Sequence, residues 1–338
     1  MVVRDQATSV GNSPGGHEAT AIALPRNPGT PLDLKAVRDV RVNRFAADHR
    51  ARTLTTRRSV KRDSQAGWLL RAVTMIDLTT LAGDDTAGRV RRLCGKARHP
   101  VRADILAALG VPAAEVRAAA VCVYHALVPT ACDALRDSGI PVAAVSTGFP
   151  AGLSPFATRI AEIRESVAAG AEEVDVVITR GSVLGGGWER LYDEVAGFRE
   201  ACGDAHIKVI LATGELGTLA NVKRAATVAM MAGADFVKTS TGKESVNATL
   251  PVGIVLARAI REYHRATGVR VGLKAAGGLK TARDALAWLI LVKEELGDAW
   301  MDPHLFRIGA SSLLADIERQ LEHHVTGRYS AFHRHPLG

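Results

Sequence analysis

Cysteine is scarce in this sequence, and the few cysteines form no pattern that a metal site or a disulfide framework requires. The chain has 338 residues and four cysteines, Cys94, Cys122, Cys132 and Cys202, with no CxxC pair and no Cys/His metal spacing. This usage is typical of a reduced, intracellular protein. No run approaches the roughly 18 apolar residues that a membrane helix needs, and residues 1–20 lack the apolar core of a signal peptide. We therefore expect a cytoplasmic protein with no membrane contact.

Several motifs of nucleotide and metal chemistry are also missing. The stretch TSTGKE could be taken for a Walker A loop, but Val237 and Glu244 stand where that motif needs Gly and Ser or Thr. No GxGxxG follows the first predicted strand, which weighs against a Rossmann dinucleotide fold. The 11 histidines form no metal constellation, and no serine or cysteine has a convincing histidine partner. We expect neither a metal nor another cofactor.

Positive charge gathers at the N-terminal end of the chain. Residues 1–70 hold 12 Lys and Arg against 6 Asp and Glu, so they carry +6 of the net charge of +8. Such an extension could bind nucleic acid or an acidic partner, but a solvated basic helix with a loose tail is the simpler interpretation and the one we favour. We therefore expect no nucleic-acid partner, and we expect a homodimer only from the general frequency of symmetric dimers.

The chain divides into four predicted segments. Residues 1–31 are rich in Gly, Pro, Ser and Thr without a sustained period, which predicts a disordered tail. Residues 32–66 show spaced apolar residues among charges, as a helical extension would. Residues 67–327 are expected to form one barrel domain, and residues 328–338 a C-terminal tail.

Short apolar or β-branched runs alternate with helical patterns that end in glycine, which predicts a parallel sheet built from strand–helix units. Eight such strands over roughly 260 residues favour a closed (β/α)₈ barrel, a TIM barrel of the α/β class, over an open sheet. The predicted strands span residues 72–78, 118–124, 142–148, 173–179, 207–213, 235–240, 270–276 and 305–310.

Four charged residues are predicted to face the barrel interior, because residues in a barrel strand alternate between the interior and the helices. In EVDVVIT the apolar face must meet the helices, so Asp175 points inward; the same parity turns Lys238 and Lys274 inward. On the first strand Asp77 and Thr79 share the inward face, which makes Thr79 a candidate substrate-binding residue. Active sites of this fold lie at the carboxyl ends of the strands. A neutral buried ion-pair network is the structural alternative.

The two interior lysines predict a nucleophile. Burial and a second ammonium on the adjacent strand both disfavour the charged form, so we expect Lys238 and Lys274 to depress each other's pKa. A neutral lysine attacks a carbonyl and forms a Schiff base. Asp175 could then form an acid/base relay with the lysine that stays charged.

Glycine turns after the last three strands predict a phosphate site, because loops after strands 7 and 8 of this fold place bare amides at helix N-termini. Glycines also cap ordinary turns, so a single pair is a weak signal. The candidate residues are Gly242, Lys243, Gly277, Gly278, Gly309, Ser311 and Ser312.

These motifs together resemble the deoxyribose-phosphate aldolase family. The stretches DFVKTSTGK, GLKAAGG, EVDVVI and RIGASSLL carry the resemblance, which runs from about residue 33 to 330. The stretches ESVNAT and HHVTGRY are similar to the longer, animal-type branch of the family.

The resemblance implies a metal-free class I aldolase of deoxyribonucleoside catabolism. It would cleave 2-deoxy-D-ribose 5-phosphate reversibly to acetaldehyde and D-glyceraldehyde 3-phosphate. It places the Schiff-base lysine at Lys238, the partner lysine at Lys274 and the proton-shuttling aspartate at Asp175. Asp77 is similar to the family's supporting carboxylate.

The sequence departs from the family pattern beside Lys274. Where the family usually reads GFKPAGG, this chain has Leu273 and Ala275, and we expect the loss of the proline to loosen the turn next to the phosphate loop. Family members often place a C-terminal tyrosine over the active site, and Tyr329 is the candidate here.

Two rival functions stay open. One is another Schiff-base barrel lyase that acts on a different phosphorylated aldehyde or ketose. The other is a binding protein that acts through its basic extension, for example on RNA.

Overall fold

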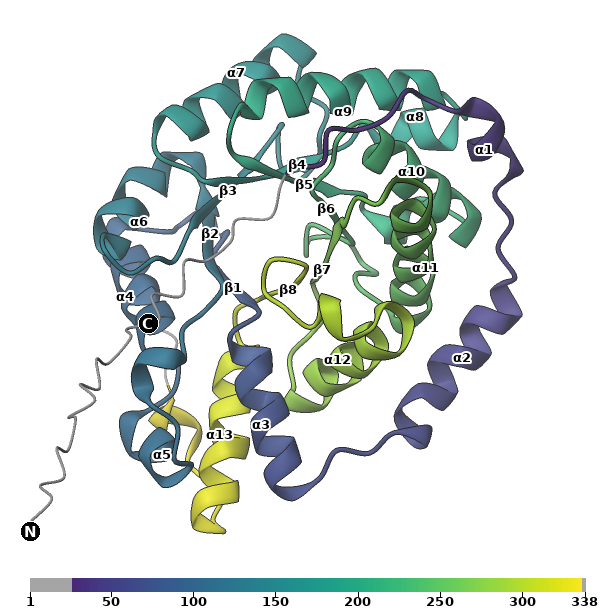
Figure 1. Ribbon diagram of the computed structural model, residues 1–338. Helices are drawn as coiled ribbons and strands as arrows, with labels where there is room; N and C mark the ends of the chain where they lie inside the picture. Colours follow the sequence, from purple (N-terminus) through teal and green to yellow (C-terminus); the bar gives the residue numbers. More distant parts are fainter. Residues whose placement is uncertain (1–25, 336–338) are drawn as a thin grey trace, which may run out of the picture.

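The computed structural model describes residues 26–335, and in this part of the chain eight parallel strands close into a barrel in sequence order, β1 next to β2 and so on to β8, which pairs with β1 (Figure 1). The predicted (β/α)₈ barrel is therefore confirmed. Each predicted strand is present. The strands are β1 (Ile76–Thr79), β2 (Ala120–Tyr124), β3 (Val142–Ser146), β4 (Glu173–Val177), β5 (His206–Ile210), β6 (Phe236–Lys238), β7 (Gly272–Ala276) and β8 (Phe306–Ala310).

Helices surround the barrel and follow each strand (Figure 1). Threonine side chains begin several of them by accepting a hydrogen bond from a first-turn amide, as Thr218 and Thr249 do. These helices are α4 (Ala87–Arg98), α5 (Ala103–Ala108), α6 (Val128–Leu135), α7 (Phe156–Ala168), α8 (Arg180–Leu184), α9 (Trp188–Cys202), α10 (Leu219–Met231), α11 (Leu250–Thr267), α12 (Ala282–Leu296) and α13 (Leu313–Thr326). Short 3₁₀ helices are η1 (Ala113–Glu115), η2 (His125–Leu127), η3 (Thr213–Glu215), η4 (Asp298–Trp300) and η5 (Phe332–Arg334).

Buried apolar side chains form two clusters, one on each side of the barrel wall. The larger cluster fills the space between strands and helices, and includes Val174, Val176 and Ile178 of the β4 region. A small cluster lies inside the barrel and includes Val177. The alternation along β4 therefore matches the predicted parity, so polar residues on the inward face meet inside the barrel.

Three helices precede the barrel: α1 (Leu34–Asp39), α2 (Arg44–Arg57) and α3 (Arg62–Val73). In Figure 1 they run along the outside of the barrel, from α9 and α10 past α11 and α12 to α13. The predicted border between extension and barrel, at residues 66 and 67, falls inside α3. No helix within residues 26–335 is both long and apolar enough to cross a bilayer.

Residues 26–31 are ordered, although the sequence predicts disorder throughout residues 1–31. The Asn27 side chain is buried and donates to the carbonyl oxygens of Met230 and Ala234, both at 2.8 Å. The backbone amide of Asn27 donates to Asp235 at 2.8 Å. Composition could not reveal these bonds because the partners are more than 200 residues away in the chain. The rest of that prediction, residues 1–25, lies outside the described residues.

The described part of the predicted C-terminal tail folds back on α13. His335 is buried, and its imidazole lies 2.7 Å from the carboxylate of Glu322 and 3.4 Å from that of Glu318. Tyr329 is 85% exposed and stacks on His323, near the end of α13. The tail is thus fixed by an ion cluster at the far end of that helix. Residues 336–338 lie outside the described part.

Candidate active site

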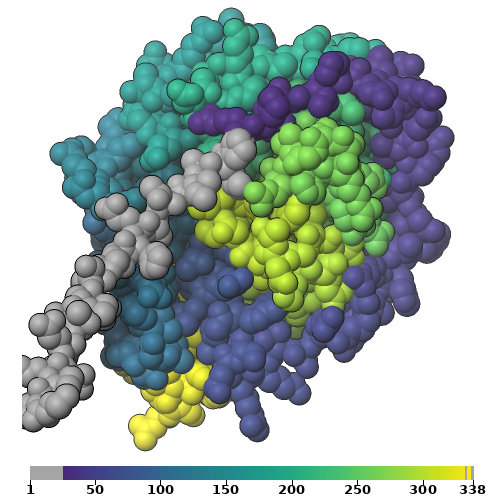
Figure 2. Space-filling model, in the orientation of Figure 1, coloured from purple at the N-terminus to yellow at the C-terminus, as the bar shows by residue number. Residues whose placement is uncertain are grey.

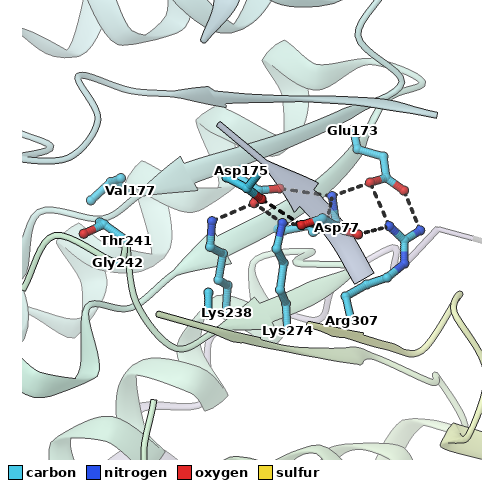
Figure 3. A network of polar contacts seen from close by, with 12 residues as sticks. Asp77, Glu173, Asp175, Val177, Lys238, Thr241, Gly242, Lys274 and Arg307 are labelled. Carbon is cyan, nitrogen blue, oxygen red and sulfur yellow. Dashed lines mark hydrogen bonds and ion pairs between the residues drawn. The ribbon is translucent and has the colours of Figure 1, made fainter. Parts of the chain in front are cut away.

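Seven charged side chains meet inside the barrel, and all of them are buried (Figure 3). Each of them belongs to a barrel strand and points into the interior, so the barrel wall shields the set from water. The seven residues are Asp77 on β1, Glu173 and Asp175 on β4, Lys208 on β5, Lys238 on β6, Lys274 on β7 and Arg307 on β8.

Asp175 is the centre of this network. One carboxylate oxygen accepts from Lys238 at 2.7 Å and from Lys274 at 2.6 Å, and the other accepts from Lys208 at 3.0 Å. Figure 3 shows the side chains of Lys238 and Lys274 side by side, both pointing at Asp175. The two lysines occupy paired positions on β6 and β7. The structure therefore brings together the three residues that the sequence predicts for catalysis.

A second group of ion pairs supports the first from deeper in the barrel. Asp77 joins the two groups, because it accepts from Arg307 at 2.6 Å and lies 2.5 Å from the ammonium of Lys274. Glu173 pairs with Arg307 at 2.8 Å and with Lys208 at 2.5 Å. These contacts fix the position of Lys274 and Asp175 on the sides that face away from Lys238.

The charges in this network do not balance when every group is ionised. Three carboxylates face three lysines and one arginine, so the fully charged set has a surplus of one positive charge. A buried surplus charge is costly because no water solvates it. Loss of one proton from a lysine restores neutrality, which distinguishes this set from the neutral ion-pair network that was the alternative.

The pKa values of Lys238 and Lys274 are shifted in opposite directions. Burial, the largest cause, lowers the pKa of Lys238, and the neighbouring Lys274 ammonium lowers it further, while Asp175 opposes the shift. Burial also acts against the charge of Lys274, but Asp175 and Asp77 together raise the pKa of Lys274 well above its ordinary value. The expected depression of one lysine by the other is confirmed for Lys238, whereas at Lys274 the two carboxylates outweigh every cause that lowers its pKa. Of the two, Lys238 is therefore the lysine that gives up its proton more readily, and Lys274 stays charged.

The carboxylates of the site stay ionised. Burial alone would raise the pKa of Asp175, but its three ammonium partners hold that pKa well below the ordinary value. Burial is likewise outweighed at Asp77, where Arg307 and Lys274 lower the pKa. An ionised Asp175 between the two lysines orients both side-chain nitrogens.

A cavity of about 360 Å³ opens above Lys238 at the carboxyl ends of the strands. This is where the fold places active sites. Every residue predicted to bind substrate lines it: Thr79, Gly242, Lys243, Gly277, Gly278, Gly309, Ser311 and Ser312. Thr80, Leu81, Ala82, Lys280 and other residues of the same loops complete the lining.

The loops around this cavity differ in the donors that they leave for an anion. The amide of Thr281 donates to Asp284 in a capping box at the start of α12, and the amide of Gly242 donates to Glu244 within its own loop. In contrast, Ser312 at the start of α13 makes no side-chain cap. The N-terminus of α13 therefore offers amides and a partial positive charge to the cavity.

Two glycines shape the cavity wall through their backbone. Gly277 and Gly278 have φ angles of +79° and +86°, a region that side chains rarely adopt. A Cβ at Gly277 would lie 2.5 Å from the side-chain oxygen of Asn247. Only glycine fits this turn without moving the loop after β6.

The side chain of Thr239, the residue that directly follows β6, also holds the turn after β7. The hydroxyl of Thr239 accepts from the amide of Ala276 at 3.0 Å and lies 3.2 Å from its carbonyl oxygen. Leu273 and Ala275, where the sequence departs from the family pattern, are buried within the strand among the helix-facing residues. Ala275, at the position where the family usually has proline, thus lies within β7 and not in the turn that was expected to loosen.

An apolar wall adjoins the charged network inside the barrel. Cys122, Phe149, Val177 and Ile210 pack together there, and Tyr124 and Leu81 lie against them. Burial raises the pKa of the Cys122 thiol, so it is protonated at neutral pH. Of these residues, Leu81 also lines the cavity.

Three members of the network were not identified from the sequence: Glu173, Lys208 and Arg307. The signal was present, because Lys208 interrupts the apolar run IKVIL and Arg307 interrupts LFRIG. The same parity that turns Asp175 inward applies to both. Tyr329 is placed elsewhere: it does not line the cavity, and it stacks on His323 instead. Among residues 26–335, no three His, Cys, Asp or Glu side chains group as metal ligands would.

Comparisons with known proteins agree with this geometry. A family model described as DeoC/LacD family aldolase matches residues 71–319. The mouse protein named deoxyribose-phosphate aldolase is 61% identical over 311 residues, which cover 91% of this chain and 98% of the relative. The human protein of the same name is 58% identical and covers 92% of this chain and 98% of its own length. Among solved structures, the Aeropyrum pernix deoxyribose phosphate aldolase superposes with a TM-score of 0.57 at 24% identity, over 79% of this chain and 97% of that one. The last match supports the fold.

Proposed function

Because this chain belongs to the DeoC/LacD aldolase family, we propose that it cleaves 2-deoxy-D-ribose 5-phosphate reversibly to acetaldehyde and D-glyceraldehyde 3-phosphate. The observation that carries the proposal is the shared carboxylate: one oxygen of Asp175 contacts both Lys238 and Lys274 beneath the cavity. The mouse and human relatives bear the name of this activity, and their match to this chain covers 98% of each relative's length.

The reaction begins at Lys238. Its neutral amine attacks the C1 aldehyde of the open-chain sugar, and the resulting carbinolamine takes up a proton from Lys274 or from a water and loses water to give an iminium ion. The C2–C3 bond then breaks, and its electron pair moves into the iminium to form an enamine on Lys238. The C3 hydroxyl gives up its proton in the same step, so the departing fragment is D-glyceraldehyde 3-phosphate.

Asp175 and Lys274 handle the protons in this scheme. Lys274, which carries its proton at neutral pH, donates to the enamine carbon or to a water beside it. Asp175 keeps the ammonium of Lys274 in place and shares the proton taken from the C3 hydroxyl. Water then hydrolyses the new iminium and releases acetaldehyde, which leaves Lys238 neutral for the next turnover.

The phosphate of the substrate is assigned to the side of the cavity that the loops after β7 and β8 form. The N-terminus of α13 and the glycine turn at Gly277 and Gly278 offer amides, and Lys243 and Lys280 at the rim offer positive charge. With the phosphate there, the aldehyde end of the open-chain sugar reaches Lys238, which lines the same cavity.

A substrate panel tests the proposed function. Acetaldehyde release should be fastest from 2-deoxy-D-ribose 5-phosphate and should vanish in Lys238→Ala, while Lys35→Ala, the same change at an exposed position of α1 outside the cavity, keeps the C–C cleavage. Release of a ketone or a different aldehyde from another phosphorylated sugar would favour a different Schiff-base lyase. Full activity in a folded Lys238→Ala variant would refute the assignment of the nucleophile.

We also propose that the protein acts in the cytoplasm and as a homodimer. The location is supported by its four unpaired cysteines, of which three are buried. The dimer is supported only by the prevalence of two-fold assemblies. Light scattering of the purified protein would decide the second point.

A further inference from the structure

A second cavity lies outside the barrel, between the N-terminal helices and α12. Its volume is about 1010 Å³, and α2, α3 and the loop that joins them form one wall. We name it the α2–α3 groove and define it by Arg57, Arg58, Lys61, Trp68 and Lys293. In the space-filling view, the purple and blue atoms of this extension lie along the yellow-green atoms of α12 (Figure 2). Its residues take no part in the barrel site.

The α2–α3 groove carries surplus positive charge. Glu294 is the carboxylate among its lining residues, and it is shared by Arg50 at 2.7 Å, Arg58 at 3.0 Å and Arg57 at 3.6 Å. Arg50 has a second partner in Glu295 at 2.8 Å. Arg57, Arg58 and the exposed Lys61 therefore face one carboxylate, which leaves about two positive charges for an anion.

The floor of the same groove is apolar and aromatic. Trp68 is half-buried, so part of its ring faces the groove, and Val60 and Ile290 lie beside it. Two exposed hydroxyl groups, of Ser59 and Ser64, add neutral hydrogen-bond donors at the rim. A flat ring next to convergent guanidinium groups suits a ligand that is both planar and anionic.

We propose that the α2–α3 groove binds a nucleotide, with two or more phosphate groups on Arg57, Arg58 and Lys61 and its base against Trp68. The volume lies at the upper end of the range of roughly 300–1000 Å³ that is typical of small-molecule sites. A small ligand is favoured over RNA because the cations converge on one bounded hollow with a single aromatic ring. Strands of RNA need a track of several stacking rings. The proposal does not depend on the aldolase activity.

Calorimetric titration of the full chain tests the proposal without any turnover. ATP should bind, inorganic tripolyphosphate should bind more weakly, and adenosine should not bind measurably, because both the phosphates and the ring contribute. ATP affinity should fall as salt rises, since exposed guanidinium groups are screened. Absence of heat with both ATP and tripolyphosphate would overturn the proposal.

Matched variants locate the site. Arg58→Ala combined with Lys61→Ala should weaken ATP binding about tenfold or more, since two charge-assisted contacts are lost. Arg44→Ala combined with Arg52→Ala removes the same charge from α2 outside the groove and should leave the affinity within about twofold. Quenching of tryptophan fluorescence by ATP should disappear in Trp68→Phe, while tripolyphosphate still binds that variant.

Three other outcomes would contradict the assignment. Equal losses in both double variants would indicate attraction by net charge alone. Loss of ATP binding in Lys243→Ala with no loss in the groove variants would place the nucleotide in the barrel cavity. A short RNA that binds more tightly than ATP, and fails to be displaced by it, would replace the nucleotide with a nucleic acid.

Discussion

Replacement of Lys274 by methionine should raise the pKa of Lys238. The acidic limb of the pH–rate profile for Schiff-base formation should then move to higher pH. Both ammonium groups contact the same oxygen of Asp175, at 2.7 and 2.6 Å, so the two nitrogens lie within about 5.3 Å of each other. At that separation, with an effective dielectric constant of about 20, their repulsion is about 3 kcal/mol. Removal of this repulsion corresponds to about two pH units.

The sign follows from the chemistry of the nucleophile. Only neutral Lys238 attacks the aldehyde, so the rate of adduct formation falls as the pH drops through the pKa of Lys238. Lys274 lowers that pKa in the native site. Without Lys274, Asp175 holds Lys238 in its charged form to higher pH, so the acidic limb of the pH–rate profile moves to higher pH.

The assay is the initial rate of borohydride-trapped adduct as a function of pH, because trapping does not need the later proton transfers of Lys274. Lys35→Met, which removes an exposed ammonium from α1 outside the cavity, is the matched control and should leave the acidic limb of the pH–rate profile in place. Turnover by Lys274→Met should fall by about 10²–10⁴ in addition, because a proton donor is lost. An unchanged or lower limb in Lys274→Met would refute the reasoning.

Other variants test separate parts of the structure. Gly277→Ala should cost about 1–2 kcal/mol of phosphate binding, because φ is positive there and Cβ meets Asn247; KM should rise for 2-deoxy-D-ribose 5-phosphate but not for the sugar without phosphate. Asn27→Ala should lower the free energy of unfolding by about 2–4 kcal/mol in urea titrations, since it leaves buried partners unpaired, and an unaffected midpoint would show that residues 26–31 are dispensable. Asp77→Asn should destabilise the protein by about 3–5 kcal/mol at neutral pH, because it leaves the buried cations of Lys274 and Arg307 without this partner. Because the folded pKa of Asp77 is depressed, its contribution is present above its ordinary pKa and lost as pH falls, so this variant should lose less stability on acidification than the parent; an identical acid profile would contradict the ion pairing.

The barrel and its central residues could be predicted because the residue pattern within each single strand indicates them. Where the neighbouring positions of a strand are apolar and meet the helices, an aspartate or lysine between them is expected to face inward, and this rule predicts the positions of Asp175, Lys238 and Lys274. Lys208 and Arg307 obeyed the same rule, yet a single charge in a strand also fits an outward snorkelling side chain. Their place in the network follows from the register of β4 with β5 and of β7 with β8, which cannot be read from the sequence alone.

The remaining features depend on contacts between distant segments. Asn27 fits against α10 and the start of β6 through backbone carbonyls, which have no signature in the sequence. The opposite pKa shifts of Lys238 and Lys274 depend on which lysine lies nearer Asp77, a distance of 2.5 Å that strand parity cannot supply. Likewise, Gly242 has the composition of a phosphate loop, but its amide is taken by Glu244.

The central claim is that Lys238 forms the covalent bond to the substrate, and borohydride reduction in the presence of 2-deoxy-D-ribose 5-phosphate tests it most directly. Peptide mapping by mass spectrometry should find the reduced adduct on Lys238 and none on Lys274. An adduct on Lys274, or no adduct in the folded protein, would contradict the account.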